Sequence, residues 1–221
     1  MEILIQDAWM WFCITFGVML LIVLIMHQQT RYFYTRDVVE RKFSILDLQL
    51  PSSAQELVNL IKGIFDLPDD QSQKTLKALR RHLYIDFIFM PAAYGSIFLL
   101  CYLAAGKMTN LGHPVFLILA WLQIIAWLCD IIENIYLLKN LNPGIVLSTP
   151  AVHKAYQVLE ITKFGIALTG VVCSVFGFLY FWLVGKYLYI SLHYLVIIIA
   201  EILLFVIGGK LLYEKYNTEK E

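Results

Sequence analysis

Long apolar runs, separated by short polar stretches, make up most of the chain. A helix needs about 20 apolar residues to cross the hydrocarbon core of a bilayer. The pattern therefore predicts an all-α polytopic membrane protein with five transmembrane helices, organised as a single membrane domain over residues 1–221. The five runs cover residues 8–26, 83–105, 115–138, 156–184 and 188–212.

The first run, residues 8–26, is expected to stay in the protein as a membrane helix. A secretory signal peptide has a basic start and a small-residue cleavage site. The chain starts with the acidic residues Glu2 and Asp7 instead, and no A-x-A motif closes the run. We therefore interpret this run as the first span.

Residues 44–82 are expected to form a cytoplasmic helical hairpin between the first two spans. Ser53 and Glu56 have the spacing of a capping box, and leucine and isoleucine follow at helical spacing. This predicts an amphipathic helix over Ser53–Phe65, with a second helix that starts near Gln71 and continues into the membrane. The apolar face of the first helix either packs under the bundle or, alternatively, lies among lipid headgroups.

Basic residues indicate the orientation of the spans. With the N-terminus outside and the C-terminus in the cytoplasm, only Lys107 and Lys186 fall on the outer side. This asymmetry follows the positive-inside rule. The chain is 60% hydrophobic and has a formal net charge of zero, so nucleic acid is not an expected partner.

Ionisable and amide side chains inside the apolar runs are the candidates for a functional site. Asp130, Glu133 and Asn134 in the third run have i, i+3 and i+4 spacing, which places them on one helix face. The predicted topology brings this face to the same depth, in the cytoplasmic leaflet, as polar residues of the second and fourth spans. The complete candidate cluster is Asp86, Asp130, Glu133, Asn134, Lys163, His82 and Glu160.

Three functions are consistent with this cluster. Intramembrane carboxylates in excess of bases are usually functional, so we expect a buried polar pocket that binds or moves a small molecule, an ion or a lipid. Alternatively, paired carboxylates would serve a membrane enzyme that acts on a lipid-like substrate. In a third interpretation, the protein is a structural or assembly protein. Its charges then only hold helices together, with Lys163 paired to Asp130 or Glu133.

Motifs for nucleophilic and zinc chemistry are absent from the sequence. There is no GxSxG or HExxH motif, and no three histidines share a membrane depth. A metal site of His82, Asp86, Asp130 and Glu133 is geometrically conceivable, but no metal, cofactor or catalytic residue is assigned. The expected partners are membrane lipids and a second copy of the chain, because five spans are few for a complete transport path.

The last two spans carry two further features. Ala167, Gly170 and Ser174 form a small-residue face that would let another helix approach closely. Glu201 lies in the middle of the last span, where an ionised carboxylate is costly. We expect it to be protonated or hydrogen-bonded, with a proton-relay site as the alternative.

A set of short motifs extends from about Arg31 to Gly177: Phe43–Leu50, Asp86-Phe87, Tyr94-Gly95, Ala120–Gln123, Asp130–Asn134 and Lys163-Phe164. In these motifs the chain resembles a group of uncharacterised bacterial integral membrane proteins. The resemblance implies a location in the bacterial inner (plasma) membrane. It implies no particular activity.

Overall fold

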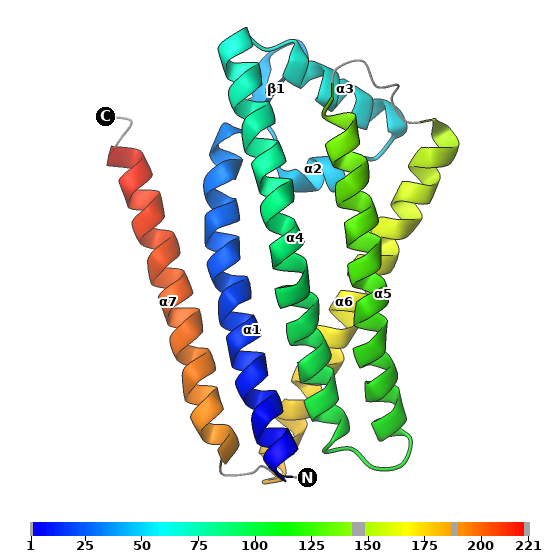
Figure 1. Cartoon of the computed structure of the whole chain (residues 1–221), viewed down its shortest axis with the longest axis vertical. Coiled ribbons are helices and arrows are strands. Elements are labelled where there is room, and N and C mark those ends of the chain that lie inside the picture. The colour runs from blue at the N-terminus through cyan, green and yellow to red at the C-terminus, as the bar shows by residue number, and fades with distance from the viewer. Residues whose placement is uncertain (1, 143–148, 187–189, 219–221) are drawn as a thin grey trace. The chain divides into compact units, whose positions relative to one another are not determined.

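The structure, a computed structural model, describes residues 2–142, 149–186 and 190–218. These residues form seven α-helices: α1 (Glu2–Gln29), α2 (Ile45–Gln49), α3 (Ala54–Phe65), α4 (Asp69–Ala105), α5 (Gly112–Asn140), α6 (Pro150–Leu183) and α7 (Ile190–Thr218) (Figure 1). Between α1 and α2 lie a 3-10 turn (Thr30–Tyr32) and two short strands, β1 (Tyr34–Arg36) and β2 (Glu40–Lys42).

Five of these helices, α1, α4, α5, α6 and α7, are long and apolar enough to cross a membrane. This confirms the prediction of an all-α polytopic membrane protein with helical segments between its first two spans. The predicted helix that starts near Gln71 and the second predicted span form one continuous helix, α4. This helix starts at Asp69 and continues through Pro91 without a break. Residues 143–148, between α5 and α6, lie outside the described residues, as do residues 188 and 189 of the last predicted span.

Contacts divide the chain into two compact units, and each is described by itself. Unit 1 comprises Met1–Ile25, Phe89–Ile124 and Ile166–Glu221. Unit 2 comprises Met26–Ile88 and Ile125–Gly165, and therefore contains every residue of the predicted polar cluster. The single membrane domain over residues 1–221 stays a prediction.

Aromatic side chains and close helix approaches build the core of unit 1. Trp9 is buried, and its ring centre lies 5.2 Å from that of Phe178 and 6.2 Å from that of Tyr194. At the predicted small-residue face of α6, a Cβ added to Gly170 would lie 2.5 Å from Gln123 Nε2 of α5. The absence of a side chain at Gly170 therefore lets α5 pack directly on α6.

The core of unit 2 forms around helix α3. The buried face of α3 joins one hydrophobic cluster with side chains of α4, α5 and α6 and with Leu141, which directly follows α5. The helix residues in this cluster include Leu79, Leu83, Leu137 and Tyr156. Each fully buried leucine or isoleucine in such a cluster contributes about 1.5–3 kcal/mol. This packing confirms the predicted amphipathic helix. The alternative, in which its apolar face lies among lipid headgroups, is wrong because that face is already covered by the protein.

A small β-hairpin in unit 2 was not predicted. Strands β1 and β2 are antiparallel, with Thr35 opposite Arg41. The Thr35 hydroxyl donates a hydrogen bond to the carbonyl oxygen of Leu60 in α3, at 2.9 Å, and so attaches the hairpin to the helix. The strands have three residues each and show no apolar alternation, so no periodic signal marks them in the sequence.

The N-terminus of α3 is capped as the sequence predicts, with one difference. Ser53 Oγ accepts a hydrogen bond from the backbone N–H of Glu56 at 3.1 Å. The Glu56 carboxylate bonds one residue further back than in a capping box, because it accepts from the backbone N–H of Ser52 at 2.7 Å and from the Ser52 hydroxyl. These bonds lower the pKa of Glu56 below its usual value.

Replacement of Glu56 by Gln is expected to lower stability at neutral pH by less than about 1 kcal/mol, because the carboxylate is largely in solvent. A lowered folded-state pKa contributes stability that is present above the unfolded-state pKa and is lost as the pH falls through the folded-state pKa. Thermal unfolding of wild type and Glu56→Gln should therefore differ at pH 7 and converge in acid. An equal difference at every pH would contradict the proposed role of the carboxylate.

Candidate functional site

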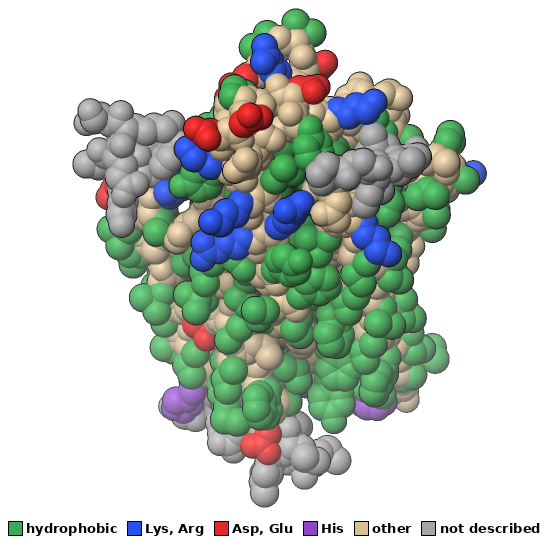
Figure 2. Space-filling view, turned by 45° about the horizontal axis from the view of Figure 1, so that its top comes forward, with side chains coloured by type: hydrophobic (Ala, Val, Ile, Leu, Met, Phe, Trp, Pro, Cys, Tyr) green, Lys and Arg blue, Asp and Glu red, His purple; other side chains and the backbone are tan. Residues whose placement is uncertain are grey.

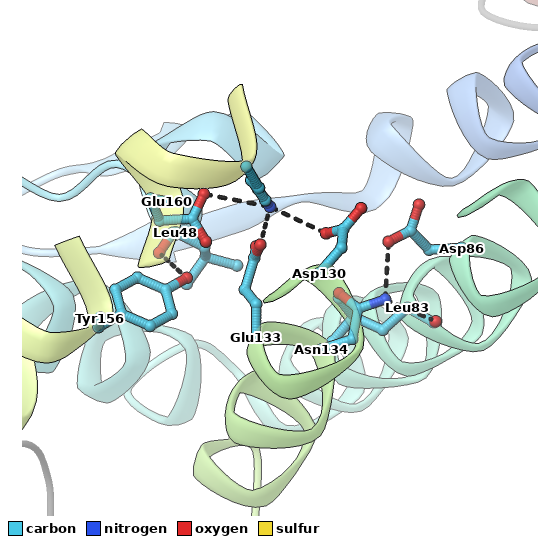
Figure 3. A network of polar contacts seen from close by, with 9 residues as sticks. Leu48, Leu83, Asp86, Asp130, Glu133, Asn134, Tyr156 and Glu160 are labelled. Carbon is cyan, nitrogen blue, oxygen red and sulfur yellow. Dashed lines mark hydrogen bonds and ion pairs between the residues drawn. The ribbon is translucent and has the colours of Figure 1, made fainter. Parts of the chain in front are cut away.

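Three helices of unit 2 deliver the predicted polar side chains to one buried place (Figure 3). Helix α5 carries Asp130, Glu133 and Asn134 on one face, as their spacing predicts. Asp86 comes from α4, and Glu160 and Lys163 come from α6. All six side chains are buried, and Glu133, Asn134 and Glu160 have no exposed surface.

The ammonium group of Lys163 is the point on which the carboxylates converge. Its Nζ lies 2.9 Å from Asp130 Oδ1 and 3.1 Å from Glu160 Oε2, and it also forms an ion pair with Glu133 Oε2. Figure 3 shows Asp130, Glu133 and Glu160 directed toward this common centre. An ammonium group has three N–H donors. The three carboxylates therefore match the full donor capacity of Lys163.

A second link joins α4 to α5. Asn134 Nδ2 donates hydrogen bonds to Asp86 Oδ2 at 2.7 Å and to the carbonyl oxygen of Leu83 at 3.4 Å. Asn134 lies next to Glu133 in the sequence. One turn of α5 therefore carries both the hydrogen bond to Asp86 of α4 and the ion pair with Lys163 of α6. The predicted pocket thus takes the form of a closed cluster that ties three helices together.

The cluster contains more negative charge and more acceptors than its donors can match. One ammonium group faces three carboxylates, and Asp86 adds a fourth acid one hydrogen bond away. Among the described residues, Glu133 Oε1, Glu160 Oε1 and Asn134 Oδ1 are buried and accept no hydrogen bond. A buried charge or acceptor that lacks a partner costs several kcal/mol. The site is therefore suited to take up a positively charged donor.

His82 is buried, but its contacts point to a different part of unit 2. Its Nδ1 lies 3.3 Å from the carbonyl oxygen of Met26, and its ring packs edge-on against Phe33. The i, i+4 spacing of His82 and Asp86 placed both on one helix face, but it could not show which neighbour each would meet. Among the described residues, no group of three or more His, Cys, Asp or Glu is arranged to hold a metal ion.

Tyr156 borders the cluster and was not among the predicted site residues. Its hydroxyl donates to the carbonyl oxygen of Leu48 in α2 at 3.2 Å, and its ring centre lies 5.1 Å from that of Tyr136 (Figure 3). Tyr156 precedes Glu160 by four residues on α6, so the i, i+4 spacing was the available signal. Tyr156 therefore links α6, which carries Glu160 and Lys163, to the short helix α2.

Glu201 lies in unit 1, where α7 faces α1. Its carboxylate fills the space beside Gly17, because a Cβ added to Gly17 would lie 2.8 Å from Glu201 Oε1. Among the described residues Glu201 Oε2 accepts no hydrogen bond, and the side chain is half-buried. The structure therefore places the Glu201 carboxylate against the backbone of α1 in unit 1. The residues of the predicted polar cluster all belong to unit 2.

Comparison of the chain with protein-family models, with curated proteins and with solved structures finds no match. The resemblance to uncharacterised bacterial membrane proteins stays a prediction from the short motifs. The function must therefore be inferred from the geometry of the cluster.

Proposed function

We propose that the chain is an inner-membrane protein whose buried cluster binds protons, and that gain and loss of a proton accompany the movement of an ion or small molecule. The cluster would lie in the cytoplasmic leaflet, with the N-terminus of the chain outside. The observation that carries the proposal is the excess of acid: three carboxylates converge on Lys163, and two of them keep a buried oxygen without a donor.

Charge balance explains why a proton is the expected ligand. If all three carboxylates were ionised, two negative charges would remain uncompensated in a site that is almost completely buried. The free-energy cost of such charges is large enough that the group is neutralised instead. A proton on Glu133 or Glu160 removes one charge and converts an acceptor into a donor. Because the three carboxylates meet at one ammonium group, a proton on one acid could pass to its neighbour over a short distance.

A proton fits the site better than a metal ion does. The convergence point of the carboxylates is occupied by the ammonium group of Lys163, whose Nζ touches all three acids. A divalent cation would have to displace this charge. A lipid-like substrate would need carboxylates that it can touch, and the glutamates of this cluster are fully enclosed. The enclosure therefore favours the smallest cation over the enzymatic alternative.

The same enclosure supports a second candidate function, in which the cluster only fixes the positions of helices. Asp86–Asn134 joins α4 to α5, and the ion pairs of Lys163 join α5 to α6. In that case the acids would affect stability alone. The two functions differ in whether a carboxyl proton is present and exchanges during activity.

Infrared spectroscopy of the purified protein at neutral pH tests the proposal. We expect an absorption band from a buried, protonated carboxyl group in wild type, and loss or displacement of this band in the double variant Glu133→Gln/Glu160→Gln. The exposed acid in Asp70→Asn is a matched control that should leave the band unchanged. Identical spectra for wild type and the double variant would contradict proton binding.

Proteoliposomes with a pH-sensitive dye test the movement of protons. Wild type should dissipate an imposed pH gradient at least tenfold faster than Asp130→Asn, because that variant removes one of the acids that contact Lys163. Asp70→Asn should match wild type. Equal rates for all three, together with lower thermal stability of Asp130→Asn alone, would favour the helix-fixing function.

A further inference from the structure

A second, separate feature of unit 2 is a groove between α4 and α5 on the surface of the protein. The groove is open to the surface and has a volume of about 230 Å³, and it is lined by Arg80, Tyr84, Ile135, Leu138, Lys139 and Asn142. At about 30 Å³ per water, this is the space of seven or eight water molecules. It would hold a group the size of a phosphodiester.

Arg80 is held in the groove by the end of α5. Its Nη2 donates to the carbonyl oxygen of Leu141 at 2.9 Å and to Asn142 Oδ1 at 3.2 Å. A guanidinium group has five N–H donors, and these two contacts use a single nitrogen. The other donors lie on a group whose orientation is already set, which lowers the entropy cost of binding an anion.

The charge in the groove is positive and unbalanced. Lys139, in the last turn of α5, is exposed and forms no ion pair with any described residue. No carboxylate from the described part of the chain lines the groove, so Arg80 and Lys139 contribute two positive charges to it. Figure 2 shows Lys and Arg side chains gathered where the hydrophobic surface of the protein meets its polar surface. A phosphate group is a natural ligand for such a pair of cations.

Apolar and aromatic residues lie beside these cations on both helices. On α4, Tyr84 follows Arg80 by one turn and is exposed. On α5, Ile135 precedes Lys139 by one turn and is also exposed. Both helices are membrane spans. The apolar part of α4 follows Arg80 in the sequence, and the apolar part of α5 precedes Lys139. The groove thus offers cations for a headgroup and an apolar strip for the start of an acyl chain.

We infer that this groove binds the phosphodiester headgroup of an anionic phospholipid. The inference is independent of the proton-binding proposal, because no residue of the polar cluster lines the groove. Free phosphate shares the headgroup chemistry, but it would leave the apolar strip beside the cations uncovered. A lipid covers both parts.

Lipid binding measured by native mass spectrometry of the full chain in detergent tests this inference. Wild type should bind phosphatidylglycerol more tightly than zwitterionic phosphatidylcholine. Lys139→Gln should weaken phosphatidylglycerol binding about fivefold, which is the effect of one lysine near an anionic surface. The matched control Arg81→Gln removes an exposed positive charge one residue from Arg80, outside the groove, and should change the affinity less than twofold.

A second variant, Arg80→Lys, tests whether the shape of the guanidinium group matters as well as its charge. Arg80→Lys keeps the charge but loses the forked geometry that reaches Leu141 and Asn142, so it should also weaken phosphatidylglycerol binding. Equal losses in Lys139→Gln and Arg81→Gln would overturn the inference, because diffuse attraction would then explain binding. Competition by millimolar inorganic phosphate that abolishes lipid binding would overturn it as well, in favour of a free-anion site.

Discussion

Replacement of Lys163 by Met is expected to lower the free energy of unfolding by about 3–5 kcal/mol, the largest loss from any single substitution in the cluster. Methionine has a similar length and fills the space, but it removes the one ammonium group among the described residues that forms ion pairs with Asp130, Glu133 and Glu160. The acids would then be buried without a cation. Thermal unfolding in detergent measures the loss.

Neutralising the acids should recover part of this stability. In the triple variant Lys163→Met/Glu133→Gln/Glu160→Gln no uncompensated glutamate remains, and we expect unfolding at a higher temperature than for Lys163→Met alone. Lys163→Arg is a useful comparison because it keeps the charge in a larger group. If Lys163→Met unfolds within 1 kcal/mol of wild type, the ion pairs do not stabilise the fold as described.

Replacement of Gly63 by Ala is expected to destabilise unit 2 by about 2 kcal/mol. The added Cβ would collide with the carbonyl oxygen of Arg36 and the hydroxyl of Thr35 in β1. Neither neighbour moves easily, because one is backbone and the other is bonded to Leu60. Alanine gains up to about 1 kcal/mol of helix propensity over glycine, so the steric effect must exceed this gain.

Gly165→Ala is the matched control for this substitution. Gly165 also lies in a helix, and apart from its chain neighbours and the nearby backbone of its own helix, no described atom lies within 4 Å of the Cβ that alanine would add. The variant should be as stable as wild type or slightly more stable. Thermal unfolding of both variants under the same conditions separates packing from propensity. A Gly63→Ala protein that is more stable than wild type would contradict the close contact of α3 with β1.

The number and order of the spans could be predicted because length and apolar composition alone determine them. The cluster could be predicted for a similar reason. Asp130, Glu133 and Asn134 share a face by spacing, and a buried charge needs a partner, so the structural interpretation paired Lys163 with Asp130 or Glu133.

Features that depend on the rotation of a helix or on irregular backbone could not be predicted in the same way. His82 shares a helix face with Asp86, yet it contacts the carbonyl oxygen of Met26, because side chains one turn apart on a helix can meet different neighbours. The β-hairpin has no periodic signal, and it is attached to the helices by hydrogen bonds from Thr35 to Leu60 in α3 and from Gln71 in α4 to Glu40. The groove at Arg80 depends on where α5 ends, and helix ends are the least regular part of a sequence pattern.

The arrangement of three acids around one amine has a mechanical consequence. An ion pair between two single residues breaks when its helices slide, but Lys163 can leave one oxygen while it stays bonded to the next. Helix α6 could thus turn or shift against α5 in small steps. At every step the ammonium group of Lys163 would keep an ion pair with at least one of the three carboxylates.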